Sequence, residues 1–267
     1  MEKAKRKFAV VTGASTGIGY ELTKQFVKHG YDVLAIADEE RIFSAARELS
    51  ELGGSVRGLQ VDLAQPKGVH TVVQAIEAEG KPLNAIAFNA GVAVSGDFVR
   101  DNALEDELNL IALNITSVVH LAKHVLPAMV ERGEGKVLIT SSIAALMPGP
   151  FYATYAASKS FLLSFSEGLT NELKDTGVTV TALMPGPTET EFFHRAGMED
   201  TKAGVSEKDD PAQVAEQGFR AMLAGEDHCI GGSFKNKVQG FATRFLSEQQ
   251  RATIHRSLTE PGSAAKQ

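Results

Sequence analysis

Six short apolar runs alternate with longer stretches whose apolar residues recur at helical spacing, and this alternation limits the fold more than any other feature. No hairpin signal joins two of the runs, so the connections are crossovers. We therefore predict one α/β domain, a Rossmann-type doubly wound parallel sheet of six to seven strands with helices on both faces. The expected strands are Phe8–Thr12, Asp32–Ala37, Val56–Val61, Leu83–Phe88, Lys136–Thr140 and Val178–Met184, with a seventh, edge strand at His228–Gly232.

Polar residues and glycines gather where these strands end. Ligands of open parallel sheets bind beyond the carboxyl ends of the strands. A set of purely structural turn residues would have no reason to favour that one edge. We therefore predict a single ligand site there, at the strand ends marked by Thr12 with Gly13, Asp38, Asp62, Asn89, Ser142 and Pro185.

The first strand runs into the glycine-rich segment Gly13–Gly19, and a helical pattern follows it. Glycines let the backbone approach a pyrophosphate, and a helix N-terminus offers free N–H groups with a partial positive charge. The segment therefore predicts a phosphate cradle for a dinucleotide. A tight turn without a ligand is the alternative, because glycines serve that purpose too.

Tyr155 and Lys159 are four residues apart, which places both side chains on one face of a helix. A phenol has an unperturbed pKa of about 10, and a neighbouring ammonium group lowers it. We expect Tyr155 to exchange a proton with an alcohol or ketone, while the hydroxyl of Ser142 holds the substrate oxygen. A chance pair on a helix surface is the alternative, and a hydride acceptor is needed to complete the reaction.

Taken together, these residues resemble the short-chain dehydrogenase/reductase family. The resemblance runs from about Phe8 to Thr190, with the pieces in the family's order and at its spacing. The matching pieces are Thr12 to Gly19 (Thr-Gly-Ala-Ser-Thr-Gly-Ile-Gly), Asp62, Asn89-Ala90-Gly91, Asn114, Ser142, Tyr155-x-x-x-Lys159 and Pro185-Gly186.

The resemblance implies hydride transfer between a nicotinamide cofactor and a secondary alcohol or ketone. Tyr155 would be the general acid/base, and Lys159 would lower the pKa of Tyr155 and bind the nicotinamide ribose. Ser142 would orient the substrate carbonyl, and Asn114 would hold a water that relays protons from Lys159. A helix-surface amide is the alternative for Asn114. A dinucleotide-sensing protein without turnover is the rival function, which the complete set of four residues argues against.

The resemblance also implies the cofactor contacts. Asp62 would bind the adenine amino group, the segment Asn89–Gly91 would line the adenosine side, and Thr188 and Thr190 would meet the carboxamide. A plain loop is the alternative for the two threonines, and Asn89 has a second expected role in tying neighbouring strands together. The full expected set is Gly13, Ser15, Thr16, Gly17, Ile18, Gly19, Asp38, Asp62, Leu63, Asn89, Ala90, Gly91, Tyr155, Lys159, Pro185, Gly186, Thr188 and Thr190.

The end of the second expected strand bears on the choice of dinucleotide. NAD enzymes of the family place an acidic residue there, whereas NADP enzymes place a cation there or in the glycine-rich segment. Here Ala37 occupies the usual acidic position, Asp38 follows it, and Thr16 occupies the loop position that is often basic. We therefore predict NAD(H). NADP(H) stays possible, because the guanidinium of Arg41 is near enough in sequence to meet a 2′-phosphate.

Beyond Thr190 the family pattern weakens. Residues 188–210 are expected to form a variable substrate loop in which Phe192, Phe193 and Met198 supply an apolar wall. Residues 233–258 are expected to form a helical extension that covers the substrate pocket or makes an interface, and the tail 260–267 is expected to be disordered. We expect a homodimer or homotetramer acting on an apolar substrate.

Composition narrows the classes of protein that remain. The net charge of −6, from 27 basic and 33 acidic residues, argues against a nucleic-acid partner. Cys229 is the only cysteine, so there is no internal disulfide, and a reducing compartment fits.

Targeting and metal binding are not expected either. No unbroken apolar run approaches the roughly 18 to 20 residues that span a bilayer. The segment Met1–Lys7 is charged and lacks the apolar stretch of a signal peptide, so a cytoplasmic protein without a membrane partner is predicted. The histidines show no metal-ligand spacing along the chain, so no metal site is predicted.

Overall fold

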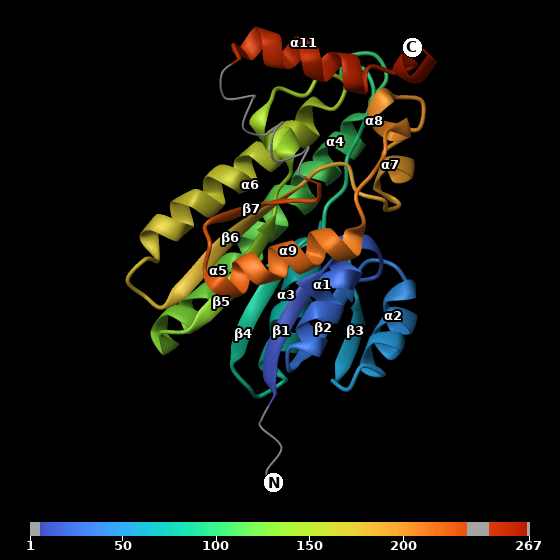
Figure 1. The fold of residues 1–267 in the computed structure, drawn as a ribbon. Coiled ribbons are helices and arrows are strands. Elements are labelled where there is room, and N and C mark those ends of the chain that lie inside the picture. The colour runs from blue at the N-terminus through green and yellow to red at the C-terminus, as the bar shows by residue number, and fades with distance from the viewer. Residues whose placement is uncertain (1–5, 234–245, 266–267) are drawn as a thin grey trace.

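A seven-stranded, wholly parallel sheet forms the centre of the molecule, in the order β3-β2-β1-β4-β5-β6-β7 (Figure 1). The computed structural model describes residues 6–233 and 246–265. The predicted fold class and all seven predicted strands are confirmed, with ends that shift by no more than a residue or so. The strands are β1 (Lys7–Thr12), β2 (Tyr31–Ala37), β3 (Val56–Gln60), β4 (Leu83–Phe88), β5 (Gly135–Thr140), β6 (Val178–Pro185) and β7 (His228–Gly231).

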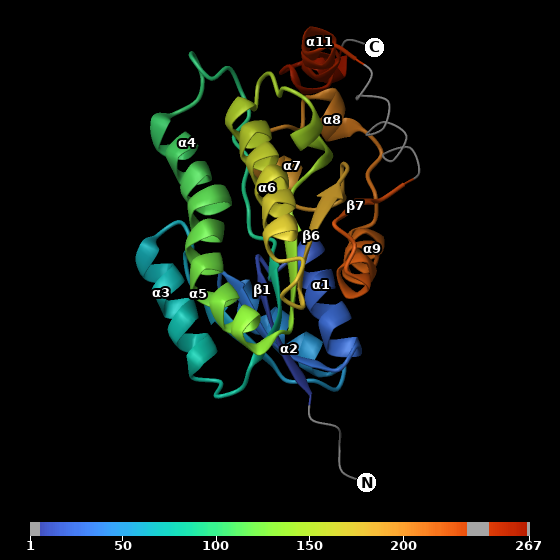
Figure 2. The ribbon, with the colours of Figure 1, turned by 90° about the vertical axis from the view of Figure 1, so that its left-hand side faces the viewer.

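Helices cover both faces of this sheet (Figure 2). One face carries α1 (Gly17–Lys28), α2 (Arg41–Ser50) and α9 (Pro211–Ala224), and the other carries α3 (Pro66–Glu77), α5 (Ser117–Arg132) and α6 (Ala153–Glu172). Further helices gather at the end of the sheet where the strands terminate. These are α4 (Leu104–Ile111), α7 (Phe192–Arg195), α8 (Lys202–Val205) and α11 (Glu248–Thr259).

The alternation of side chains along β1 explains the two cores. Ala9 and Val11 are buried against the α1, α2 and α9 side, while Phe8 and Val10 are buried against the α3, α5 and α6 side. Successive residues of a strand point to opposite faces, so a strand covered on both faces must be apolar throughout. This is why the six predicted strands are recognisable as unbroken apolar runs.

The segment Leu104–Arg132 is helical throughout, but a π-helical turn at Ala112–Thr116 separates α4 from α5. Pro127 lies inside α5 without ending it. By length and composition alone, this 29-residue segment is long and apolar enough to cross a membrane. It was missed from the sequence because only unbroken runs of apolar residues were considered there. Its apolar side packs on the sheet through residues such as Leu121 and Met129, and this packing accounts for its composition.

The C-terminal part of the chain corrects one expectation. The predicted helical extension is present as α11, although its expected first part, residues 234–245 with Phe241 and Phe245, lies outside the described residues. The tail was predicted to be disordered, but it is ordered as far as residue 265. The N–H of Gly262 donates to the carboxylate of Asp200 at 2.8 Å, and the N–H of Lys202 donates to Ser263 Oγ at 2.9 Å. These hydrogen bonds hold the tail against α8.

The aromatic cluster under α1 should contribute strongly to stability. Phe26 is fully buried and meets the rings of Tyr31 and Phe219 edge-on, at centroid distances of 5.2 and 5.0 Å. Phe26→Ala should lower the free energy of unfolding in urea by about 3 to 5 kcal/mol. Phe43→Ala, at a 45% exposed position on α2, should change it by less than about 0.5 kcal/mol. Equal losses in the two variants would contradict this account of the core.

Candidate active site

A cleft of about 720 Å³ lies across the carboxyl ends of the strands, within the size range of small-molecule and cofactor sites. Every residue predicted to contact the cofactor lines this cleft except Gly19. Of the four predicted catalytic residues, Ser142, Tyr155 and Lys159 line it, whereas Asn114 is buried behind it. The fold therefore brings together residues that are spread over most of the sequence.

Three glycines allow the loop after β1 to pack closely. Gly13 and Gly17 have positive φ angles of 66° and 56°, and a Cβ on either would lie 2.8 Å from a carbon of Ala90 or Thr190. A Cβ on Gly19 would lie only 1.9 Å from the carbonyl oxygen of Gly13. Gly19 thus serves the packing of the loop and does not line the cleft, so its contact with a cofactor stays a prediction.

The N-terminus of α1 opens into the same cleft. Thr16 is its N-cap residue in extended conformation, and within the described chain its side chain makes no capping hydrogen bond. The first N–H groups of the helix are therefore available to an anionic ligand. Together with the close packing that the glycines permit, this fits the pyrophosphate of a dinucleotide.

Asn89, at the end of β4, ties three strands together. Its Nδ2 group donates to the carbonyls of Thr12 and Gly13, both at 3.2 Å, and its Oδ1 accepts from Thr140 Oγ1 at 3.2 Å. The Oγ1 of Thr12 accepts in turn from the N–H groups of Asn89 and Ala90, at 2.9 and 3.0 Å. The expected role of Asn89 in tying neighbouring strands is thus present, in a residue that also lines the cleft.

Ser142, Tyr155 and Lys159 converge at the ends of β5 and β6. Ser142 caps a 3₁₀ turn by accepting from Ala144 N at 3.1 Å, and its hydroxyl forms a hydrogen bond with Tyr155. The ammonium of Lys159 donates to the carbonyl of Thr140 at 2.9 Å and lies 5.7 Å from the ring centroid of Tyr155. Tyr155 and Lys159 are buried on α6, which gives these two side chains fixed positions.

Burial, rather than the neighbouring ammonium, dominates the electrostatics of the pair. Burial raises the pKa of Tyr155 to about 12, and the hydrogen bond with Ser142 opposes that rise. Burial also lowers the pKa of Lys159 to about 8. The expected lowering of the pKa of Tyr155 is therefore wrong for the protein alone, because burial outweighs the opposing hydrogen bond with Ser142. Tyr155 is protonated at neutral pH and can act as a proton donor.

Asn114 lies in the π-helical turn and is fully buried, so the helix-surface alternative is wrong. Its Nδ2 donates to the carbonyl of Val92 at 2.9 Å and to Ser158 Oγ at 3.0 Å, and its Oδ1 accepts from Val92 N at 2.9 Å. Both amide hydrogens are therefore occupied. The side chain joins the loop after β4 to α6, and its role in a water relay stays a prediction.

Comparison with known proteins decides the family. A family model described as short chain dehydrogenase matches residues 7–200. The chain belongs to the short-chain dehydrogenase/reductase family. It is accordingly an NAD(P)-dependent oxidoreductase of CH–OH and C=O groups.

Relatives and solved structures agree with this assignment. A 3-oxoacyl-[acyl-carrier-protein] reductase of Salmonella typhimurium is 34% identical over 205 residues, 74% of this chain and 80% of that enzyme. A short-chain dehydrogenase of Sphingobium yanoikuyae, solved in complex with NADPH, is 30% identical with a TM-score of 0.78, over 84% of this chain and 87% of that one. The L-sorbose reductase of Gluconobacter frateurii, solved with NADPH and L-sorbose, is 25% identical with a TM-score of 0.74, over 86% and 97% of the two chains.

In this short-chain dehydrogenase/reductase, aromatic rings surround Tyr155. Phe192 packs against Tyr155 at a centroid distance of 5.2 Å, and Tyr152 stacks on its other side at 5.5 Å with an interplanar angle of 17°. Phe193 and Met198 line the same part of the cleft, as predicted for the substrate loop. Tyr152 was not singled out from the sequence, although its position three residues before Tyr155 on the same helix end was a signal for it.

Helix α11 closes this end of the cleft, where His255, Leu258 and Thr259 line it. Since a carbonyl can only accept, His255 Nδ1 must carry the hydrogen that it shares with Pro148 O at 2.8 Å. The Nε2 of His255 then accepts from the hydroxyl of Tyr152. Burial lowers the pKa of His255, in keeping with this neutral form. No sequence pattern links residues so far apart, so His255 could not be predicted.

Acidic and basic groups lie side by side at the opposite end of the cleft, where the adenosine is expected. Asp38 is exposed and lines the cleft, whereas Arg41 lies outside it and donates through Nε to the carbonyl of Ser15 at 3.3 Å. Glu39 accepts from Ser15 Oγ at 2.5 Å and from Arg195 at 3.2 Å, and the hydrogen bond from Ser15 lowers the pKa of Glu39. Glu39 and Arg195 were missed, although the adjacent carboxylates at positions 38 and 39 were visible in the sequence.

We expected no metal site because the histidines showed no metal-ligand spacing along the sequence, and that premise is wrong. His120 and His124 are one helical turn apart on α5, and His70 on α3 faces them. One ring nitrogen from each lies within 4.8 Å of the others. The i, i+4 spacing was present in the sequence, but only the packing of α3 on α5 supplies the third ring.

Gly19→Ala tests the close packing of the glycine-rich loop. The new Cβ would meet the carbonyl oxygen of Gly13, so we expect a loss of about 3 kcal/mol or more in the free energy of unfolding. Gly168→Ala is the matched control, because its Cβ would meet nothing within 4 Å at an exposed site on α6. That control should stabilise the protein by about 0.5 to 1 kcal/mol. Equal effects in denaturant unfolding would contradict the packing argument.

Proposed function

We propose that the enzyme interconverts a secondary alcohol and a ketone, with Ser142, Tyr155 and Lys159 acting directly on the reacting groups. The observation that carries this proposal is the convergence of Ser142, Tyr155 and Lys159 in a cleft that also contains the glycine-rich loop. Two relatives named as reductases, of a 3-oxoacyl thioester and of L-sorbose, act on ketone carbonyls, which supports the reaction class.

The mechanism follows from the hydrogen-bonding capacity of the three side chains. The glycine-rich loop Gly13–Gly19 and Lys159 would hold a nicotinamide dinucleotide, which in the direction of reduction would supply a hydride for the carbonyl carbon. Ser142 donates a hydrogen bond to the carbonyl oxygen, and Tyr155 gives its proton to that oxygen as negative charge develops. The ammonium of Lys159 stabilises the phenolate that remains. Asn114 acts as a positioning residue through Val92 and Ser158.

The substrate end of the cleft favours an apolar molecule. Phe192, Phe193, Met198 and Leu258 contribute to its walls, together with the ring of Tyr152. Polar groups lie among these walls. The nitrogen of His255 is engaged by the hydroxyl of Tyr152, and the ammonium of Lys208 lies 5.2 Å from the ring centroid of Phe193. A mid-sized hydrophobic ketone, such as a steroid, an acyl chain or an aromatic ketone, matches the apolar walls.

For the cofactor we propose NAD(H). Asp38 lines the cleft just after β2, where a carboxylate accepts from a ribose 2′-hydroxyl and repels a 2′-phosphate. NADP(H) is the second candidate, favoured by the Sphingobium structure with NADPH and by Arg41 over the carbonyl of Ser15. The position of Arg41 outside the cleft lining is the reason for ranking NADP(H) second.

We also propose that the enzyme works in the cytoplasm as a homodimer or homotetramer, without a nucleic-acid or membrane partner. The single cysteine and the acidic net charge support the location and the absence of nucleic acid. Light scattering coupled to size exclusion measures the oligomeric state, and a monomer at micromolar concentration would contradict the assembly.

Tyr155→Phe tests the catalytic assignment. Removal of the proton donor should lower kcat for a reacting ketone by about 10² to 10⁴-fold, with cofactor affinity nearly unchanged. Tyr20→Phe, on the outer part of α1, is the matched control and should keep full activity. Near-full turnover by Tyr155→Phe would contradict the mechanism. Tight cofactor binding without turnover on any carbonyl tested would instead favour a sensing protein.

Asp38→Arg tests the cofactor assignment. The substitution should shift the ratio of Kd values for NADH and NADPH by at least about tenfold toward NADPH, a change of about 1.4 kcal/mol. Glu40→Arg adds the same charge two residues away, at an exposed site outside the cleft lining, and should change the ratio far less. If wild type already prefers NADPH, or if the two variants behave alike, the NAD(H) proposal is wrong.

The pH dependence of reduction should report Lys159. Its pKa of about 8 means that the ammonium is lost as pH rises through that value, whereas Tyr155, with a pKa of about 12, stays protonated. The value of kcat/KM for ketone reduction should therefore be constant at low pH and fall above about pH 8. Lys159→Arg keeps its charge and should remove that fall, even at lower activity. A flat wild-type profile up to about pH 10 would contradict a requirement for the cation.

A further inference from the structure

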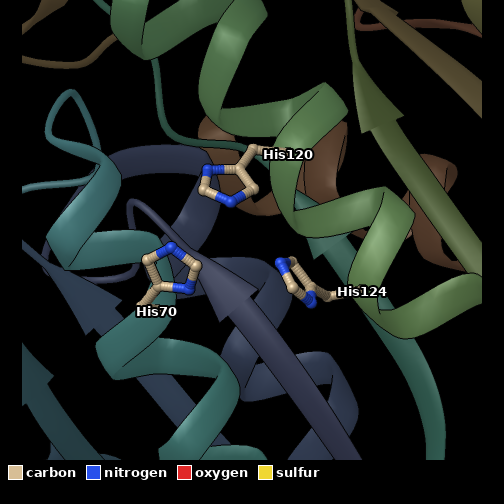
Figure 3. A group of neighbouring side chains, drawn as sticks. All are labelled: His70, His120 and His124. Carbon is tan, nitrogen blue, oxygen red and sulfur yellow. The ribbon is translucent and has the colours of Figure 1, made fainter.

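Three histidine rings face one another between two helices (Figure 3). We name this group, His70 of α3 with His120 and His124 of α5, the three-histidine cluster. The ring centroids are 5.0 Å apart for His70 and His120, 5.7 Å for His70 and His124, and 5.2 Å for His120 and His124. The described lining of the cleft contains none of the three. The cluster is therefore separate from the hydride-transfer site.

The surrounding core fixes the positions of the two helices that carry the rings. His70 follows Val69 on α3, and Val69 is buried in the core on this face of the sheet. His120 and His124 flank Leu121 on α5, which is buried in the same core. Both helices are thus held against the sheet by apolar residues adjacent to the histidines. The rings meet as a consequence of the fold, and binding an ion needs no rearrangement of the backbone.

The distances suit a small cation with nitrogen ligands. In a tetrahedral zinc site, with Zn–N bonds of about 2.0 to 2.1 Å, neighbouring nitrogens are about 3.3 Å apart. The ligand nitrogens of the cluster lie within 4.8 Å of one another. Side-chain rotations that move each nitrogen by roughly 1 Å would bring the three to the spacing of a zinc site. Imidazole suits zinc, copper and nickel, whereas magnesium and calcium prefer oxygen ligands.

The rings are also free to take a ligand. Within residues 6–233 and 246–265, no hydrogen bond or ion pair is found for the three side chains, whose rings pack against one another. His70 and His124 are exposed and His120 is half-buried, so an ion can enter from solvent. Burial and the two neighbouring rings lower the pKa of His120, which favours the neutral imidazole.

We propose that His70, His120 and His124 bind one divalent transition-metal ion of the zinc class, with water at the remaining coordination position. The ion joins α3 to α5 and so acts as a clamp on one layer of the fold. It takes no part in hydride transfer, because its three ligands lie outside the cleft.

Calorimetric titration of zinc chloride into chelator-treated protein without a polyhistidine tag tests the proposal. We expect one ion per chain. The variants His70→Gln, His120→Gln and His124→Gln should each weaken binding at least about tenfold, since even the loss of groups that support a metal ligand costs about 10 to 100-fold. His228→Gln is the matched control, because His228 is a partly exposed histidine paired with Asp227 on β7. That control should bind zinc as the wild type does.

A second measurement keeps the test decisive if a variant folds poorly. Cobalt(II) added to the wild-type protein should give the visible absorption of a site with nitrogen ligands, and zinc should displace it in a one-to-one ratio. Excess zinc should raise the melting temperature of the wild type, and a chelator should reverse the rise. The proposal is overturned if wild type takes up no zinc at millimolar concentration. Zinc binding that the three substitutions leave unchanged overturns it as well.

Discussion

The hydrogen bonds of Asn89 are the constraint on which the site depends. This one amide joins the ends of β1, β4 and β5, through Thr12 and Gly13 on one side and Thr140 on the other. The backbone carbonyl of the same residue, Thr140, accepts a hydrogen bond from the ammonium of Lys159. The glycine-rich loop and the proposed catalytic residues are thereby held in one frame, which the sheet supports.

Burial of Tyr155 and Lys159 determines their protonation states. The rings of Tyr152 and Phe192 enclose Tyr155, and α11 closes the cleft beyond them. Exclusion of water raises the pKa of Tyr155 and lowers that of Lys159, so the protein alone holds a neutral acid beside a cation that is easily lost. In the proposed mechanism, few water molecules compete for hydrogen bonds to the charge that develops on the substrate oxygen. Each hydrogen bond from the protein to that oxygen is therefore stronger than it would be in water.

Sequence reasoning succeeded where the signal was local. Buried strands had to be apolar on both faces, so their positions could be predicted, and the spacing of Tyr155 and Lys159 sufficed to place them on one helix face. Sequence reasoning failed for contacts that depend on how distant segments pack together. The contact of Tyr152 with His255 and the approach of His70 to α5 join residues far apart in the chain. The direction of the pKa shift of Tyr155 depended on burial, which no local pattern reports.

Direct transfer of hydrogen from the cofactor to the substrate is the central claim. The most direct measurement uses NADH or NADPH with deuterium at the reactive carbon of the nicotinamide, a ketone that the enzyme accepts, and mass spectrometry of the alcohol. The account predicts one deuterium per product molecule, bound to the carbinol carbon, while the oxygen-bound hydrogen comes from Tyr155 and exchanges with water. Alcohol formed without deuterium at that carbon would contradict hydride transfer in this cleft.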